Sequence, residues 1–203
     1  RTDVLVLAEP PRLSPAAAEV ARRFVREGGG LLVIPGPATE AASLNLHVAP
    51  GGKPGPLPVR LGEIKGYDRR EDGCFFPSLA GQGEHPVLAD LKGGLRTVLA
   101  GTPIYRFMQA VPAGEGSEVI LRLDDDRASP LLAAARFGRG RVLYLASPIR
   151  AGDDRWNELG TPFLAFPLLH PCARYLARSR DRAFNLAVGE PLVERHPGRV
   201  EDC

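Results

Sequence analysis

The sequence contains few cysteines, no long apolar run and no strong excess of either charge. Its three cysteines, Cys74, Cys172 and Cys203, show neither the CxxC spacing of a zinc site nor the density of a disulfide framework. The formal net charge of +2 gives no reason to expect nucleic acid as a partner. No run reaches the ~20 apolar residues that a membrane helix needs. These absences argue against a disulfide scaffold, structural zinc and direct membrane insertion.

The first forty residues have the pattern of a βαβ unit. Residues 3–8 form a short apolar run, which predicts a strand buried on both faces. Ser14 is a good N-cap for a helix that Pro15 opens and residues 28–30, all glycine, end. Residues 31–34 then predict a second buried strand at the centre of the sheet. The apolar positions of the helix, which predict its buried face, are Ala17, Val20, Ala21, Phe24 and Val25.

The remaining elements are predicted from a change in periodicity. The expected elements are a short helix within 38–46, an edge strand over 59–64, antiparallel strands over 104–111, 118–123 and 131–137, a tight turn over 137–141, and a central strand over 142–146. Residues 161–178 predict a long helix that Pro167 or Pro171 should kink. The apolar positions expected on its buried face are Phe163, Phe166, Leu169, Ala173 and Leu176.

Two stretches carry a resemblance to a known family. Residues 3–10 and 24–37, DVLVLAEP and FVREGGGLLVIPGP, resemble the second half of class I glutamine amidotransferase-like domains. The segment FGRGRVLYLASPI, followed by DDRWNELGTPFLAFPLLHPCARYL, is similar to the amidotransferase-like modules of Bat-related, aerotolerance regulator-like bacterial membrane proteins. The resemblance covers most of residues 2–180.

The resemblance implies an α/β fold: a flavodoxin-like, class I amidotransferase-like three-layer sandwich. Its sheet would be mostly parallel, with an antiparallel β insertion or extension. The first βα units of that fold would be missing before Arg1, and because the chain does not begin with Met we expect it to be part of a longer protein. We therefore expect an amidotransferase-like domain over residues 1–180, followed by a linker and the start of another β segment over 181–203.

The catalytic residues of active relatives are not matched. Active members place a cysteine nucleophile on the strained turn after the strand that corresponds to residues 31–34, and Pro35 stands at that position. They supply a histidine and a glutamate after the strand that corresponds to 142–146, where this chain has Ser147 and Pro148. Covalent chemistry of this kind needs a thiolate and a base to activate it. The resemblance thus implies an amidotransferase-like fold without amidotransferase activity.

Three other groups of residues are possible sites of chemistry. Cys74 and His85 could form a nucleophile–base pair, or an unpaired cysteine and a turn histidine. Residues 124–126, all aspartate, could bind a divalent cation, or simply form a soluble turn between two strands. His170 and Cys172 lie two residues apart in a helix, so they should point to different faces, which disfavours joint metal binding and favours a core cysteine. We favour the structural interpretation of each group.

The most interesting polar cluster follows the central strand. Residues 153–157, which include Asp153, Asp154, Trp156 and Asn157, lie where ligands gather in open α/β sheets. We favour the alternative interpretation, a loop whose Trp156 covers the sheet edge and anchors the last helix. The candidate cleft combines this cluster with the residues that follow the other two predicted parallel strands. Its members are Glu9, Pro35, Gly36, Pro37, Thr39, Ser147, Asp153, Asp154 and Trp156.

These observations lead to one functional hypothesis and two alternatives. We expect a non-catalytic structural or interaction module, without cofactor or metal, that contacts other domains of the same chain or other envelope proteins. The resemblance alone implies an extracytoplasmic domain of a membrane-anchored bacterial protein. The alternatives are a small-ligand sensor that uses the candidate cleft, and a hydrolase or transferase with a non-standard site at Cys74 and His85 or at Asp153 and Asp154.

Overall fold

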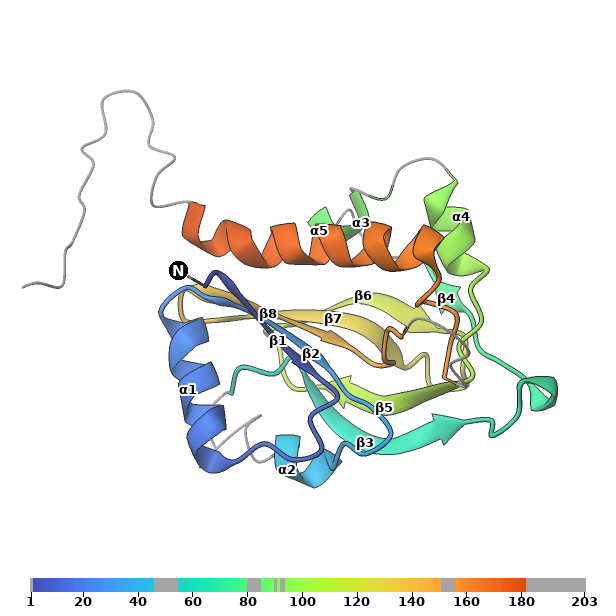
Figure 1. Ribbon diagram of the computed structural model, residues 1–203, viewed down its shortest axis with the longest axis horizontal. Helices are drawn as coiled ribbons and strands as arrows, with labels where there is room; N and C mark the ends of the chain where they lie inside the picture. Colours follow the sequence, from blue (N-terminus) through green and yellow to red (C-terminus); the bar gives the residue numbers. More distant parts are fainter. Residues whose placement is uncertain are drawn as a thin grey trace, which may run out of the picture.

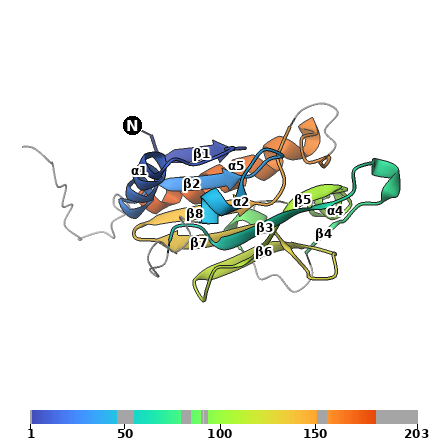
Figure 2. The same cartoon turned by 90° about the horizontal axis from the view of Figure 1, so that it is seen from below.

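The computed structural model describes residues 2–45, 55–79, 85–89, 91, 94–150 and 156–181. Its main feature is a six-stranded mixed sheet (Figures 1 and 2). The strands, in their order across the sheet, are β1 (Val4–Ala8), β2 (Gly30–Ile34), β8 (Gly140–Leu145), β7 (Pro130–Phe137), β6 (Ser117–Leu123) and β4 (Pro77–Ser78).

Parallel pairing is confined to one side of this sheet. β1 pairs with β2 and β2 with β8 in parallel, whereas the β8–β7, β7–β6 and β6–β4 pairs are antiparallel. The expectation of a mostly parallel, flavodoxin-like sheet is therefore wrong. The physical reason is the short connections after β6 and β7, because tight turns join antiparallel neighbours and parallel neighbours need a crossover.

A second, two-stranded sheet packs on one face of the first. It consists of β3 (Val59–Gly66) and β5 (Arg106–Pro112), which pair antiparallel with an irregularity between Leu61 and Ile64. We call this sheet the β3–β5 ribbon. The helices α1 (Pro15–Arg26) and α2 (Ala41–Asn45) lie on the same side of the main sheet (Figure 1).

The opposite face is covered by the long helix α5 (Pro162–Asp181). The short helices α3 (Pro86–Ala89) and α4 (Leu95–Ala100) pack against α5 (Figure 1). A 3-10 turn, η2 (Arg70–Asp72), follows β3. The sequence did not predict α3 or α4, because neither is long enough to show a helical period.

The predicted ends of α1 are confirmed, and its predicted buried face is partly wrong. The Ser14 hydroxyl accepts a hydrogen bond from the backbone N–H of Ala17 at 3.2 Å, as an N-cap should. Gly28 ends the helix with a φ of 107°, which favours glycine. The face against the sheet comprises Ala18, Ala21 and Val25, while Val20 is 56% exposed.

The strands of the parallel part differ in burial. β2 is buried along its whole length and lies between β1 and β8, which confirms it and β8 as central strands. β1 is an edge strand in which Val6 is 50% exposed, so the expectation of a strand buried on both faces is wrong there. Both strands come from short apolar runs in the sequence. Their burial differs because β1 lies at the edge of the sheet and β2 lies inside it.

The buried face of α5 matches the expected one only in part, since Leu176 is buried and Leu169 packs against the core. The predicted members Phe163 and Phe166 are 83% and 71% exposed, and Ala173 is exposed. The side chains that pack on the sheet are Leu164, Leu168, Cys172, Tyr175 and Leu176. Apolar residues occur on both sides of this helix, so the spacing alone does not identify the face that meets the core.

Two further points concern the C-terminal third of the chain. Pro167 and Pro171 both lie inside α5, which continues past them. No helix within the described ranges is both long and apolar enough to cross a membrane. The expected linker and β segment over 181–203 lie outside the described residues, apart from Asp181 at the end of α5.

Candidate functional site

The carboxyl ends of the three parallel strands meet at one edge of the sheet. Glu9 follows β1, Pro35 and Gly36 follow β2, and Ser147 follows β8 by two residues. The structure thus brings these members of the candidate cleft to a common edge, as the sequence predicts for parallel strands. We call this region the carboxyl edge.

An ion pair crosses the carboxyl edge directly above the end of β2. The Arg150 guanidinium donates from Nε to Glu9 Oε1 at 2.7 Å, and its Nη2 donates to Glu9 Oε2. Because β2 lies between β1 and β8, this pair connects the two outer strands over Gly36. A side-chain carbon on Gly36 would overlap the Glu9 side chain. The space above the turn is therefore filled by Glu9.

The turn after β2 is closed by its own hydrogen bonds. The backbone N–H of Gly36 donates to Thr39 Oγ1 at 2.9 Å, and the N–H of Thr39 donates to the Gly36 carbonyl at 3.0 Å. Pro35 is buried and brings no N–H to the turn. The Gly36 amide is therefore used within the turn, with the Thr39 hydroxyl as its acceptor, and is not offered to a substrate oxyanion.

Ser147 belongs to a buried network held by an asparagine. Its hydroxyl donates to the Arg106 carbonyl at 2.9 Å and accepts from Asn157 Nδ2 at 2.6 Å. The same Asn157 amide donates to the Pro148 carbonyl, and its Oδ1 accepts from the Leu159 N–H at 2.8 Å. Ser147 and Asn157 are 0% and 3% exposed. This network fixes the segment after β8 and offers no base to activate the Ser147 hydroxyl.

Trp156 is a packing residue of the same region. It is 4% exposed, and its carbonyl accepts from the N–H groups of Tyr105 at 2.8 Å and Arg106 at 2.9 Å. The Arg106 guanidinium lies over its ring at 5.7 Å. These contacts agree with the structural interpretation of Trp156. Asp153 and Asp154, the other members of that cluster, lie outside the described residues.

Cys74 and His85 are held at opposite ends of β6. The backbone N–H of Phe76, two residues after Cys74, donates to Asp124 just beyond the C-terminal end of β6. His85 Nε2 lies 3.9 Å from a carboxylate oxygen of Glu118, near the start of β6. A strand of this length spans roughly 20 Å. The structure therefore does not bring the proposed nucleophile and base together.

The thiol of Cys74 also has the wrong electrostatics for a nucleophile. Burial raises its pKa, and the nearby carboxylates of Asp124 and Glu158 raise it further. A reactive cysteine needs the reverse, a thiolate stabilised by positive neighbours. Cys172 is buried against the sheet, and burial raises its pKa to about 12.

His85 is a buried core histidine. It is 6% exposed, its ring packs on Tyr175 at 4.7 Å, and its Nδ1 accepts from the Val87 N–H at 3.2 Å. Its Nε2 has no hydrogen-bond partner within the described ranges, apart from the long contact with Glu118. Burial lowers the pKa of His85, Arg141 lowers it further, and Glu118 opposes them.

The aspartates 124–126 act as turn residues. Asp124 accepts from the Phe76 N–H at 2.7 Å, and Asp125 accepts from both the N–H and the hydroxyl of Ser129. Within the residues described, no three metal-ligating side chains gather in a way that could hold an ion. His170 and Cys172 face different directions, as predicted: Cys172 packs on the sheet and His170 is exposed.

Arg150 was absent from the predicted residues of the carboxyl edge, whereas Asn157 lies in the polar cluster 153–157 that the sequence singles out. Arg150 follows a proline-containing turn and shows no helical or strand period. No recognisable motif marks the hydrogen bonds that either residue makes. Their roles depend on which strands are neighbours, since Arg150 reaches Glu9 across 141 residues of sequence.

Comparisons with known proteins give neighbours in structure only. No family model matches the chain, and no curated protein matches it. The cytoplasmic protein STM3548 from Salmonella typhimurium is similar, with a TM-score of 0.63 and 19% identity over 86% of this chain and 71% of that one. STM1381 from Salmonella typhimurium LT2 gives a TM-score of 0.61 at 20% identity, with the same coverage.

A β-galactosidase from Rahnella sp. R3 shares the fold at a TM-score of 0.54 and 15% identity, over 85% of this chain. The chain spans only 22% of the length of that enzyme. At these identities the likeness concerns the arrangement of helices and strands. It assigns neither a site nor a reaction to this chain.

Proposed function

We propose that this chain is a non-catalytic interaction module that binds another protein domain through the outer face of α5. The observation that carries the proposal is the exposure of Phe163 and Phe166, at 83% and 71%. The His170 ring stacks on Phe166 with centroids 5.4 Å apart. These three residues, three and four positions apart, follow one side of the helix, and we call them the α5 outer stripe.

Two exposed phenylalanines on one helix face carry a free-energy cost that docking would remove. Burying a phenylalanine side chain contributes about 1.5–3 kcal/mol, so a partner that covers both gains several kcal/mol. The residues of α5 that hold the helix to its own sheet are different ones, Leu164 and Leu168 among them. The α5 outer stripe is thus free to contact an apolar surface of a second domain without disturbing the fold.

The filled carboxyl edge supports a module over an enzyme or a sensor at that edge. The Glu9–Arg150 pair lies over the Pro35–Gly36 turn, and the Ser147 hydroxyl is engaged on both sides. The enzyme alternative at Cys74 also loses support, because a thiol with a raised pKa reacts slowly. A thiol reagent at neutral pH should therefore label Cys74 slowly; labelling as fast as that of a free low-pKa cysteine would revive the enzyme hypothesis.

The partner belongs to the same polypeptide or to another protein of the cell envelope. The envelope placement rests on the family resemblance alone and stays a prediction. The proposed binding mode needs only an apolar surface on the partner, whichever chain carries that surface.

Photo-cross-linking tests the proposal. A photoreactive phenylalanine analogue at position 166 should give a discrete cross-linked product in cells, and the product should disappear when Phe163→Ser is added. The same analogue at Val20, which is 56% exposed on α1, is the matched control and should give no such product. Equal products at both positions, or a product that Phe163→Ser leaves unchanged, would contradict the proposal. A product of twice the mass of the chain would identify self-association instead.

A further inference from the structure

A cavity of about 330 Å³ lies between the β3–β5 ribbon and the turn that joins β6 to β7. It is remote from the α5 outer stripe, which is on the other side of the main sheet (Figure 1). Its volume falls in the range of small-molecule sites. The ribbon side contributes Lys65, Gly66, Tyr67, Phe107 and Gln109, the segment before β4 contributes Phe75, and the turn contributes Asp125, Asp126 and Arg127.

One end of the cavity is an aromatic wall. Tyr67 and Phe75 stack with their ring centroids 5.4 Å apart and their planes 26° apart. Phe75 in turn meets Phe107 edge-on, at 5.4 Å and 88°. Such pairs favour defined geometries, so the wall is shaped before any ligand arrives.

The backbone fixes this wall in place. The N–H of Tyr67 donates to the Tyr105 carbonyl at 2.9 Å, and Phe75 exchanges two hydrogen bonds of 2.8 Å with Ile104. Gly66 has a φ of 119°, and a Cβ there would overlap the Tyr105 carbonyl. Glycine at this position therefore allows the chain to pass close to β5 and turn Tyr67 toward the cavity.

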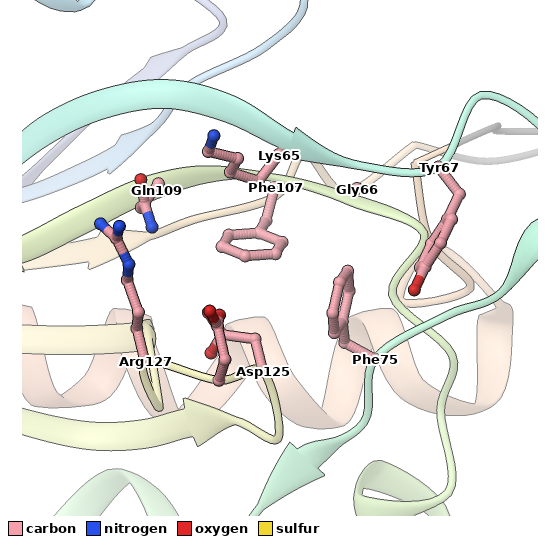
Figure 3. Close-up of a pocket in the computed structure, with 9 residues that line it drawn as sticks. Lys65, Gly66, Tyr67, Phe75, Phe107, Gln109, Asp125 and Arg127 are labelled. Atoms are coloured by element: carbon pink, nitrogen blue, oxygen red, sulfur yellow. The ribbon is translucent and has the colours of Figure 1, made fainter.

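The opposite end of the cavity carries hydrogen-bond donors. In Figure 3, Lys65, Gln109 and Arg127 lie at the end away from Tyr67 and Phe75. Within the described part of the chain, the side chains of Gln109 and Arg127 have no hydrogen bond or ion pair. Lys65 has a single exposed contact with Glu63 at 3.6 Å. These donors are thus available to a ligand.

Carboxylates limit how much negative charge the cavity accepts. The Asp125 carboxylate points into the middle of the cavity (Figure 3), and both of its oxygens already accept hydrogen bonds from Ser129. Asp126 is exposed on the same turn. The lining of the cavity thus contains two cations and two carboxylates. A ligand with one negative charge gains the donors at little cost, whereas a doubly charged phosphate is opposed by the aspartates.

We propose that this cavity binds a small aromatic carboxylate. Its ring packs against Tyr67 and Phe75, and its carboxylate accepts hydrogen bonds from the Arg127 guanidinium, with Lys65 and the Gln109 amide beside it. Arginine suits this role because its planar fork matches a carboxylate. The arrangement calls for a ligand in which a few bonds separate the ring from the acid.

The test is a binding titration with 3-phenylpropionate as the probe and its uncharged amide as the matched ligand, followed by NMR of the full chain. We expect a Kd of about 0.1–1 mM for the acid, with the largest shifts at the backbone amides of Gly66, Tyr67 and Gln109. Arg127→Gln should weaken the acid about tenfold and leave the amide unchanged. Arg60→Gln, an exposed arginine on the same strand as Lys65, is the charge-matched control and should change neither.

The outcomes that overturn the proposal are equally specific. It fails if neither ligand binds at a concentration about tenfold above the expected Kd. It also fails if the NMR shifts lie elsewhere on the surface. It also fails if Arg127→Gln and Arg60→Gln weaken the acid equally. Tighter binding of phenyl phosphate or of a neutral sugar would assign the cavity to a different class of ligand. Phe75→Leu tests the aromatic end of the cavity separately from the donor end. It should weaken the binding of the acid and of the amide by the same factor.

Discussion

The carboxyl edge and the cavity under the β3–β5 ribbon contain similar polar residues in opposite conditions. At the carboxyl edge, Ser147, Asn157 and Glu9 are bonded to other groups of the protein. In the cavity, Gln109 and Arg127 have no such bonds, among the residues described. A polar residue at a favoured topological position is therefore not by itself a site. Unused hydrogen-bonding capacity is the better guide to ligand binding.

The sharpest way to break this comparison is to delete one amide from each region. Asn157→Ala should lower the free energy of unfolding by about 3 kcal/mol, because it leaves the Leu159 N–H and the Pro148 carbonyl buried without their partner. Gln109→Ala is the matched control, and chemical denaturation should find it within about 0.5 kcal/mol of the parent chain. Equal losses in the two variants would mean that the two regions do not differ in this way.

The two sides of α5 give the second comparison. Leu168→Ala should lower the free energy of unfolding by about 3 kcal/mol, because Leu168 lies in the core and is only 2% exposed. Phe166→Ala, on the α5 outer stripe, should cost less than about 0.5 kcal/mol in the isolated chain. Thermal or urea unfolding measures both. A large loss from Phe166→Ala would show that the stripe is part of the chain's own fold, and the proposed docking surface would lose its basis.

Gly36→Ala tests whether the Glu9–Arg150 pair really covers the turn after β2. The new methyl group would take the place of the Glu9 side chain and separate it from Arg150, at a cost of about 1–2 kcal/mol. Gly114→Ala, where the added carbon meets nothing within 4 Å, is the control and should be nearly neutral. If both substitutions leave the denaturation curves unchanged, the Glu9 side chain does not fill the space over Gly36.

The pH dependence of stability that His85 causes is the smallest of the expected effects. Burial of the histidine fixes the sign of this dependence. Its folded-state pKa is lowered from the ordinary value of 6.5, so protonation favours the unfolded chain. The stability contribution is present above pH 6.5 and is lost as the pH falls toward the lowered pKa. Denaturation between pH 7.5 and 5 should show this loss in the parent chain and less of it in His85→Gln.

Two further variants refine the pH experiment. His170→Gln, at an exposed histidine, should keep the pH profile of the parent chain. Glu118→Gln should make the chain more sensitive to acid, because Glu118 is the group that opposes the lowering of the His85 pKa. Stability that rises on acidification over this range would contradict the assignment of His85 as a neutral core residue.

The sequence predicted where helices and strands begin and end better than it predicted which neighbours they pack against. The caps of α1, the buried strand β2 and the hairpin that leads into β8 follow from local signals such as Ser14, Gly28 and Gly138, and all three are confirmed. The burial of β1 was predicted wrongly, and the inward face of α5 was predicted correctly only at Leu169 and Leu176. Both depend on which elements are neighbours, and a short apolar run or a helix with apolar residues on two sides carries no such information.

The candidate site was predicted in part for the same reason. The sequence placed Glu9, Gly36 and Ser147 at one edge because parallel strands end together, and the structure places them there. It could not reveal that Arg150 reaches Glu9 across 141 residues of sequence, nor that Lys65, Gln109 and Arg127 surround a cavity. The first contact depends on the order of the parallel strands, and the cavity depends on how the β3–β5 ribbon packs on the main sheet, and no motif marks either.

The most direct test of docking through α5 compares variants of the carboxyl edge and of the α5 outer stripe in one cross-linking experiment. With the photoreactive analogue at position 166, the yield of the cross-linked product should be unchanged by Glu9→Gln at the carboxyl edge and abolished by Phe163→Ser on the α5 outer stripe. Circular dichroism of each variant would establish that it is folded. A yield that falls with Glu9→Gln and survives Phe163→Ser would contradict docking through the α5 outer stripe and place the function at the carboxyl edge.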